Sequence, residues 1–222
     1  AQSEAANGCT YVNTWMHAGP VRVNSEKMSK SLGNFFTIRD VLEKYNAEVV
    51  RFFLARVHYR TYIDYSEDTL KEARVMLERF YQALRGVELA DVAPENDFND
   101  RFNAAMDDDF NTPKAISVLF ELVNELNKAS RENSEQAGQL AYQLKNLGDI
   151  LGLFQQDPDA FLKGEDKEGE LSSDDIEKLI EQRADAKKAR DFAESDRIRD
   201  ELAAQGVILK DSREGTTWFR EA

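Results

Sequence analysis

Four segments of the sequence repeat apolar residues at the three- to four-residue spacing of an amphipathic helix. Each such stripe must be buried against another element, so several in succession predict an antiparallel helical bundle and a mainly α fold. The apolar positions are Val49, Val50, Phe53 and Val57 in 47–59; Leu70, Leu77, Phe80, Tyr81 and Leu84 in 67–86; Ile116, Leu119, Phe120, Val123 and Leu126 in 113–129; and Leu140, Leu144, Leu147, Leu151 and Phe154 in 137–154.

Capping residues predict where the helices begin and end. A Ser, Thr, Asn or Asp side chain at the first position accepts a hydrogen bond from a backbone N–H that lacks a partner inside the helix. A glycine just past the last turn ends a helix. The predicted caps are Thr37 with Asp40, Asn46, Ser66, Ser172 or Ser173, and Asp191 with Glu194; the terminal glycines are Gly86 and Gly206.

Four other stretches predict strands or linkers. "GPVRVN" alternates around Val21 and Val23 and predicts a short strand, and "VILKDSREGTTWF" predicts two strands joined by a glycine-containing turn. Residues 87–97 and 157–171 are rich in acidic and turn-forming residues, so we expect both to be surface linkers.

The charge of the chain limits how it can meet nucleic acid. The 222 residues carry a net charge of −13, which disfavours polyanion binding by the overall field of the protein. Residues 1–60 nevertheless carry 8 basic and 5 acidic side chains. Any contact with nucleic acid must therefore use local basic surfaces.

Cysteine and histidine are scarce. Cys9 is the only cysteine, and His17 and His58 are the only histidines, so we expect no internal disulfide and no metal site built by this chain. No apolar run approaches the roughly 18 residues of a membrane span, and no signal peptide is recognisable, which predicts a cytoplasmic protein. The sequence begins without methionine, and we expect it to be part of a longer protein.

The stretch "EKMSKSLGNF" at residues 26–35 has neither helical nor strand periodicity. It places Lys27 and Lys30 three residues apart, together with the hydroxyl groups of Ser29 and Ser31. Ammonium groups on such a loop can stabilise the charge that develops on a leaving pyrophosphate, and the hydroxyls add neutral donors. Lysines at this spacing are also common as solvated surface charges, so the spacing alone leaves both interpretations open.

A family resemblance favours the first interpretation. "KMSKS" is identical to the second signature of class I aminoacyl-tRNA synthetases. With "YVNTWMHAGPVRVNSEKMSKSLGNFFTIRDVL", "AEVVRFFLARVHYR", "MDDDFNTPKA" and "GTTWFR", essentially the whole chain resembles bacterial cysteinyl-tRNA synthetases. The resemblance implies the end of a Rossmann-type catalytic domain with the lysine loop at 1–36, a helical connecting region at 37–95, a DALR-type anticodon-binding bundle at 96–165 and a small α-α-β-β anticodon-recognition unit at 172–222.

The resemblance also implies substrates and an ATP site. The family activates L-cysteine with ATP to cysteinyl adenylate and transfers it to tRNA(Cys), and we expect a monomer. Lys30 and Lys27 would act on the ATP phosphates, with Ser29 and Ser31 beside them, and Trp15 and His17 would line the adenosine side. For Trp15 the alternative is plain core packing, and for His17 a structural hydrogen bond.

Two family features do not occur in the sequence. One is the HIGH-type first signature, which holds ATP at a helix N-terminus, and the other is the set of Cys, His and Glu ligands for a zinc ion that recognises the cysteine thiolate. Cys9 does not fall at a ligand position. We therefore expect the C-terminal half of such a ligase, inactive in isolation, with zinc bound upstream of this chain.

The middle of the chain resembles regions that touch tRNA. Arg39, Arg51, Arg56 and Arg60 would meet phosphate groups there, although exposed arginines often only solvate a helix. Consecutive acids on a helix point in different directions, so residues 107–109, all aspartates, are expected to support the next turn rather than hold a metal. Asn111 or Thr112 would cap the helix that follows.

The tail predicts a surface that recognises anticodon bases. Unpaired bases are bound by aromatic stacking and by hydrogen bonds to their edges, with cations on the phosphates. Phe192 would stack, Asp196 and Asp211 would accept from base amino groups, and three cations would contact phosphates. The cations are Lys187, Lys188 and Arg190. The alternative for Phe192 is that it anchors its helix in the core of the tail.

Two other functions fit parts of the sequence. A related cysteine ligase that acts on a small amino sugar shares the lysine loop, but it would not need an anticodon unit. The chain can also be an RNA-binding and packing module without catalysis of its own.

Overall fold

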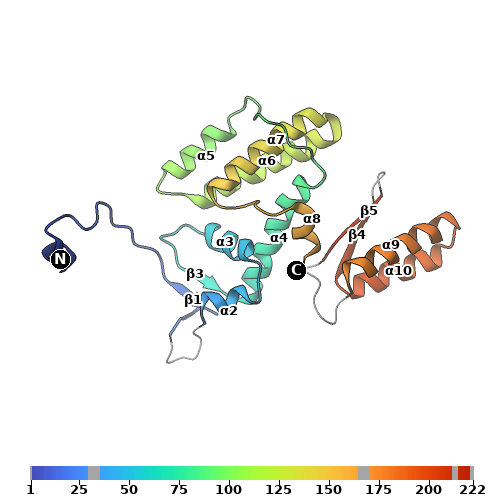
Figure 1. Cartoon of the computed structure of the whole chain (residues 1–222), viewed down its shortest axis with the longest axis horizontal. Coiled ribbons are helices and arrows are strands. Elements are labelled where there is room, and N and C mark those ends of the chain that lie inside the picture. Colours follow the sequence, from blue (N-terminus) through green and yellow to red (C-terminus); the bar gives the residue numbers. More distant parts are fainter. Residues whose placement is uncertain (1, 30–35, 165–170, 212–214, 221–222) are drawn as a thin grey trace.

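The computed structural model describes residues 2–29, 36–164, 171–211 and 215–220, and within them it confirms the predicted mainly α fold (Figure 1). The elements follow the chain as α1 (Gln2–Asn7), β1 (Val21–Val23), β2 (Glu26–Lys27), α2 (Ile38–Leu42), α3 (Ala47–Ala55), β3 (Ile63–Tyr65), α4 (Glu67–Leu84), α5 (Phe98–Asp107), α6 (Thr112–Glu132), α7 (Ser134–Ile150), α8 (Pro158–Lys163), α9 (Ser173–Lys188), α10 (Phe192–Ala204), β4 (Val207–Asp211) and β5 (Thr216–Arg220).

The predicted caps form as expected. Thr37 and Asp40 make both bonds of a capping box, and Ser66 makes the same arrangement with Thr69. The side chains of Asn46, Asn111, Ser172 and Asp191 each accept from a backbone N–H in the first turn of α3, α6, α9 and α10. The local sequence therefore fixes the starts of six helices.

Three short strands form a small sheet in the order β2-β1-β3. β1 runs antiparallel to β2, with Arg22 opposite Lys27, and parallel to β3, with Val21 opposite Ile63. β1 is the strand predicted from "GPVRVN". The sheet pairs β1, the strand that precedes the lysine loop, with residues 63–65, 42 positions later in the sequence.

A single hydrophobic core surrounds α4. Figure 1 shows this helix running from the small sheet, beneath the bundle, toward the tail. Its buried residues pack with α3, with the bundle helices α5–α7 and with α8, so the connecting region and the bundle share one core. The largest fully buried side chains of this core are Tyr81, Phe52, Phe80, Phe102, Phe154, Leu70, Leu77, Leu119, Leu122, Leu126 and Leu144.

A buried carboxylate joins three parts of this core. Glu48 on α3 accepts hydrogen bonds from the hydroxyl of Tyr81 on α4 at 2.8 and 2.9 Å. It also accepts from the backbone N–H of Phe154 at 2.6 Å and of Gln155 at 3.3 Å, in the segment after α7. Burial raises the pKa of Tyr81, and the hydrogen bond to Glu48 adds to this effect. The Glu48 carboxylate therefore holds α3, α4 and the end of the bundle together.

The prediction that residues 157–171 are a surface linker is wrong for the first part of that range. Residues 158–163 form α8, whose start is capped by Asp157 with Pro158 in the first turn. Phe161 is buried and stacks on Tyr81 with ring centroids 4.0 Å apart. Asp-Pro is a helix-start signal, and the charged residues around it obscured the two apolar residues that α8 buries. Residues 165–170 lie outside the described part.

The tail is a hairpin against two helices, as predicted. β4 and β5 pair antiparallel, with Leu209 opposite Trp218, and the hairpin lies between α8 and the helices α9 and α10 (Figure 1). Val207 and Trp218 pack with α9 and α10 in a small second core, whereas Phe219 joins the main core. Successive side chains of a strand point to opposite faces, so the hairpin joins the two cores.

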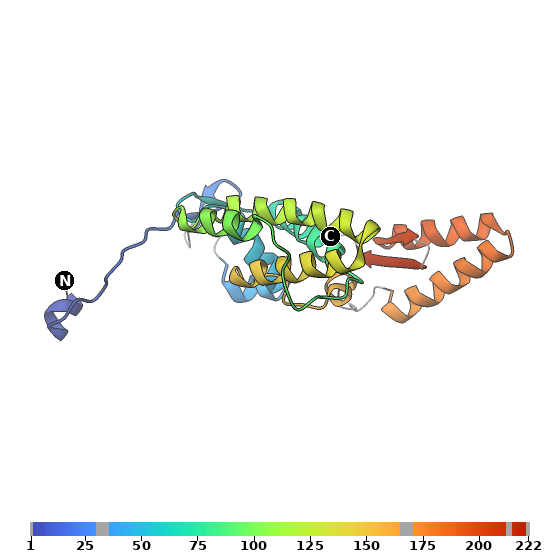
Figure 2. The ribbon, with the colours of Figure 1, turned by 90° about the horizontal axis from the view of Figure 1, so that it is seen from above.

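Polar contacts reinforce this junction, and the tail is not a unit attached only through a linker. Arg85 on α4 donates to the carbonyl oxygen of Trp218 at 3.2 Å and pairs with Asp159 of α8. Lys163 at the end of α8 pairs with Glu177 of α9 at 3.0 Å. Figure 2 shows the bundle and the tail following one another along the long axis. In the described part of the chain, no helix is both long and apolar enough to cross a membrane.

Candidate functional site

The lysine loop is entered through a tight turn that a distant strand holds in place. Asn24 and Ser25 connect β1 to β2 and both have positive φ, 50° and 66°, as the two central residues of a type I′ hairpin turn require. Asp64 on β3 accepts from the Ser25 backbone N–H at 2.8 Å and from its hydroxyl at 2.7 Å. The backbone hydrogen bond, followed by the hydroxyl, lowers the pKa of Asp64. The turn is therefore pinned to β3.

The neighbouring residue of β3 holds the other end of the loop. The ring of Phe36 lies 4.4 Å from the ring of Tyr65, measured between centroids. Directly afterwards, Thr37 opens α2 through its capping box. Consecutive residues of β3, Asp64 and Tyr65, thus contact residues on the two sides of the "KMSKS" segment.

The structure locates only some of the predicted loop residues. Lys27 is the last residue of β2 and is exposed, and Ser29 is half-buried. Lys30 and Ser31 lie outside the described residues. The roles of these four side chains toward ATP remain predictions, but the clamp on both sides of the segment was not predicted at all. No local pattern identifies Asp64, because its partner is 39 residues away.

The structure does not bring Trp15 and His17 against the described part of the lysine loop. The N-terminal segment extends away from the remainder of the chain (Figure 1). Trp15 is 72% exposed, and His17 is exposed as well. Trp15 therefore does not pack in a core formed by the described residues, and a role on the adenosine side remains a prediction. Gly19 ends the extended segment by donating its N–H to the carbonyl oxygen of Tyr59 at 2.7 Å.

The four arginines predicted to meet phosphate have different environments. Arg56 is largely buried, lies over the ring of Phe53 and is 3.5 Å from a carboxylate oxygen of Glu72. Arg60 is held by Asp109. Arg39 and Arg51 are exposed and have no carboxylate partner among the described residues, so they are the better candidates for contacts with a polyanion.

Asp109 ties the bundle to the loop after α3. It has a φ of 54° and accepts from Arg60 Nε at 2.6 Å and from the Tyr59 hydroxyl at 2.7 Å. The hydrogen bond from Arg60, then that from Tyr59, lowers its pKa to about 2. The aspartates at 107–109 were predicted to support the following turn, whereas the side chain of Asp109 contacts a segment about fifty residues earlier. Because Asp109 pairs with Arg60, this arginine is less available for a contact with phosphate.

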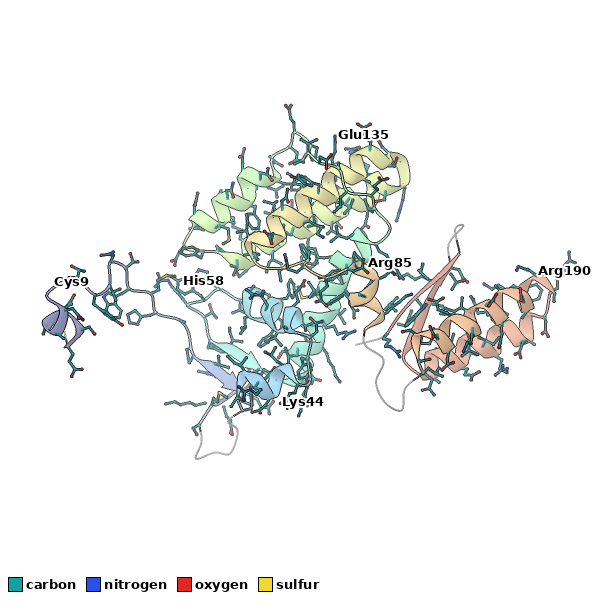
Figure 3. The ribbon with its side chains drawn as sticks, in the orientation of Figure 1. Cys9, Lys44, His58, Arg85, Glu135 and Arg190 are labelled. Carbon is teal, nitrogen blue, oxygen red and sulfur yellow. The ribbon has the colours of Figure 1, made fainter. Side chains whose placement is uncertain are left out.

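The cations and the aromatic ring predicted in the tail lie around the junction of α9 and α10. Figure 3 shows Arg190 at the outer end of the tail, pointing away from the two helices. Phe192 is 64% exposed, so the alternative that it anchors α10 in the core is wrong. Lys188 is exposed and pairs with Asp185 at 3.0 Å, and Asp196 is exposed, 3.5 Å from Arg199. An exposed ring among cations can stack on a base.

Asp211 has a different environment from the one predicted. Its carboxylate forms a bidentate pair with Arg183 on α9, at 2.8 and 2.9 Å, and accepts from Lys187 Nζ at 2.8 Å and from the Thr216 hydroxyl at 2.7 Å. The Arg183 hydrogen bond, then those from Lys187 and Thr216, lowers the pKa of Asp211. The structure therefore assigns Asp211 and Lys187 to an internal network, and sequence spacing gave no sign of Arg183.

The described residues do not offer a metal site. No group of three or more His, Cys, Asp and Glu side chains converges closely enough to hold an ion in that part of the chain. Cys9 is exposed. These side chains therefore do not fit the zinc ion that the family resemblance implies.

Three family profiles match successive parts of the chain. Residues 1–75 match the catalytic domain of class I tRNA synthetases (C), residues 101–155 match the DALR domain, and residues 170–218 match the cysteinyl-tRNA ligase anticodon-binding domain. The first range contains the lysine loop with both of its β3 anchors, the second contains most of the bundle, and the third contains most of the tail.

Curated relatives match along the full chain. A cysteine–tRNA ligase from Chromohalobacter salexigens is 60% identical over 223 aligned residues, which are 100% of this chain and 48% of the relative. Those from Marinobacter nauticus and Laribacter hongkongensis are 58% and 56% identical over 99% of the chain. The chain spans about half the length of the curated relatives it matches. Among solved structures, LeuRS of Agrobacterium radiobacter in a ternary complex with tRNA and LeuAMS is 23% identical, with a TM-score of 0.47, over 65% of this chain and 21% of that one.

A lysine loop entered from a hairpin that pairs with a parallel strand, followed by a DALR bundle and an anticodon-binding unit, is an arrangement of the class I aminoacyl-tRNA synthetases. Within that class, the chain belongs to the cysteine–tRNA ligase family.

Proposed function

We propose that this chain is the C-terminal half of a monomeric, cytoplasmic cysteine–tRNA ligase, which activates L-cysteine with ATP and transfers it to tRNA(Cys). The observation that carries the proposal is the identity of 53–60% to cysteine–tRNA ligases along essentially the whole chain. The division of labour follows the predicted ranges: 1–36 complete the catalytic domain, 37–95 contact the inner side of the tRNA, and 96–165 and 172–222 bind its anticodon arm.

In the proposed activation, a carboxylate oxygen of cysteine attacks the α-phosphorus of ATP, and the bond to pyrophosphate breaks. Negative charge then builds on the pyrophosphate, where Lys27 and Lys30 would stabilise it. Asp64 and Tyr65 support this role because they fix the residues on both sides of the loop. Contacts within the chain that position the loop before ATP binds lower the entropic part of the barrier.

Transfer follows when a hydroxyl group at the 3′ end of the tRNA attacks the cysteinyl carbonyl and AMP leaves. The chain's own contribution to this step would be to hold the tRNA. The exposed arginines Arg39 and Arg51 and the tail cluster of Lys188, Arg190 and Phe192 support this contribution. Zinc enters the proposal only through other parts of the ligase, and no step assigned to this chain uses it.

The proposal is tested most directly at Phe192. Removing a ring on which a base stacks costs about 1 to 3 kcal/mol, so Phe192→Ala should weaken binding of tRNA(Cys) by about 5- to 150-fold. Fluorescence anisotropy of the 222-residue chain with a labelled tRNA(Cys) transcript measures this. Tyr11→Ala is the matched control, because Tyr11 is 65% exposed and lies outside the tail.

The possible outcomes test base stacking on Phe192 separately from tRNA binding by the whole chain. Unchanged affinity of Phe192→Ala would show that no base stacks on Phe192. A lower melting temperature with unchanged affinity would contradict the exposed position of the ring. Failure of the wild-type chain to bind tRNA(Cys) at low ionic strength would overturn the tRNA-binding function itself.

A further inference from the structure

A basic groove lies where α4, α6 and β4 meet. It has a volume of about 530 Å³ and is bounded by side chains from all three elements. The polar side chains that line it are Arg79 and Gln82 from α4, Asn124, Asn127 and Arg131 from α6, and Lys210 from β4. None of these residues was singled out by the sequence patterns or belongs to the predicted sites.

The cations of the groove are not neutralised by the described residues around them. Arg79 and Arg131 are exposed, and neither has a carboxylate partner in the described ranges. Lys210 donates to Gln82 Oε1 at 2.7 Å and lies 5.4 Å from the ring centroid of Phe219. Of the described residues that line the groove, none is acidic. In a chain of net charge −13, a concave surface with three cations and no acid is unusual.

The side chains of the groove suit phosphodiester groups. An arginine presents a planar fork of N–H donors that matches two phosphate oxygens, and an ammonium group binds phosphate as a point charge. The amides of Asn124 and Asn127 add neutral donors, which frequently contact nucleic-acid backbones. The amides can also contact base edges, but three cations without an acid in the lining favour the charged backbone.

Strand β4 connects the groove to the tail. Lys210 in the groove is followed by Asp211, which pairs with Lys187 on α9 at 2.8 Å. Strand β4 therefore joins the groove on the body to the helices that carry Arg190 and Phe192.

We propose that this groove binds phosphate groups of an RNA backbone. Under the proposed function, on which this assignment rests, the RNA is tRNA(Cys) and the groove holds its backbone beside the segment that the tail recognises. The contacts are independent of sequence, so they contribute affinity and position rather than base discrimination.

The test is the salt dependence of tRNA binding. The variants are Arg79→Gln, Arg131→Gln, Lys210→Gln and the triple variant, with Lys71→Gln as the control because Lys71 is exposed on α4 outside the groove. Each substitution that removes a phosphate contact should reduce the slope of log K against log salt concentration by about 0.7 to 0.9. In the triple variant the slope should therefore fall by about 2 to 3. At about 0.1 M salt this variant should bind at least about tenfold more weakly.

The salt slope is measured together with the anticodon preference and the melting temperature of each variant. The groove variants should keep the preference of the wild-type chain for tRNA(Cys) over an anticodon-mutated tRNA, and their melting temperatures should match that of Lys71→Gln. If the wild-type chain binds tRNA and the triple variant shows the same salt slope, the proposed phosphate-binding role of the groove is wrong, while the proposed function stands. Loss of anticodon preference in the groove variants would show base reading instead of backbone contact. If the wild-type chain does not bind tRNA, both the proposed function and the phosphate-binding role of the groove are wrong.

Discussion

Asp211→Asn separates the role that the structure gives this residue from the role predicted by the tail sequence. In the structure, its carboxylate compensates the guanidinium of Arg183, whose side chain is only 6% exposed. Asparagine has nearly the same shape but carries no charge, and its amide nitrogen would face the donors of Arg183 and Lys187. We therefore expect Asp211→Asn to destabilise the tail.

The magnitude follows from the exposure of the two partners. Removing one partner of a fully buried pair costs about 3 to 5 kcal/mol, whereas exposed pairs contribute about 0.2 to 1 kcal/mol. Arg183 is buried but Asp211 is 47% exposed, so water screens part of the interaction. We expect a loss of about 2 kcal/mol in the free energy of unfolding. Asp196→Asn, at an exposed position 3.5 Å from Arg199, should cost less than about 0.5 kcal/mol.

Tryptophan fluorescence in urea can follow this loss. The chain has two tryptophans, of which Trp218 is buried in the tail core and Trp15 is exposed. In a Trp15→Phe background, the signal therefore reports the unfolding of the tail. Asp211→Asn should lower the urea midpoint without changing the slope of the transition.

The pH dependence gives an independent check with a defined sign. The pKa of Asp211 is lower in the folded state than the unfolded value of about 3.9, so its carboxylate stabilises the fold above that pH. This contribution is lost as the pH falls below about 4, toward the folded pKa. The difference between wild type and Asp211→Asn should therefore shrink in that range. A variant with wild-type stability that no longer distinguishes anticodon-mutated tRNA would refute the structural reasoning and restore Asp211 as a base contact.

Two further predictions concern the loop and the core. In the full-length ligase, Lys30→Ala should slow cysteinyl adenylate formation by about 100- to 1,000-fold with little effect on cysteine binding, because the charge that it stabilises appears only as pyrophosphate leaves. An unchanged single-turnover rate of adenylate formation would contradict this role of Lys30. Glu48→Gln should cost about 2 to 4 kcal/mol in urea unfolding, since an amide nitrogen would face the N–H of Phe154 or the hydroxyl of Tyr81. If the carboxylate joins these elements, the double variant with Tyr81→Phe should lose less than the sum of the single variants, and additive losses would contradict the contact.

Both ends of the chain use long-range contacts to position short recognition segments. Asp64 and Tyr65 on β3 hold the two sides of the lysine loop through contacts with Ser25, 39 residues earlier, and Phe36, 29 residues earlier. Phe219 and Arg85 hold the tail against α4 and α8. The segments predicted to meet ATP and RNA are thus connected through the shared core around α4, with Glu48 and Tyr81 at its centre.

The sequence by itself determined the features that depend on neighbours a few residues apart. Helix starts at Thr37, Asn46, Ser66 and Asp191 were predicted because a cap bonds within its own first turn. The helical faces follow from a period of about 3.6 residues. The hairpin of the tail follows from strand-like residues on both sides of a glycine-containing turn. The lysine loop was recognised because its residue types are contiguous.

Only the tertiary structure decided which side chains meet across the chain. It pairs Asp211 with Arg183, separated by 28 positions, and Asp109 with Arg60, separated by 49, so predicted recognition residues became internal ties. It also buries Phe161 and Leu162 of α8, a segment that its charged sequence had marked as a linker. The physical reason is that a charge or an apolar residue has the same local pattern whether its partner is water, another segment or RNA. The partner is chosen by packing, which no short window of sequence contains.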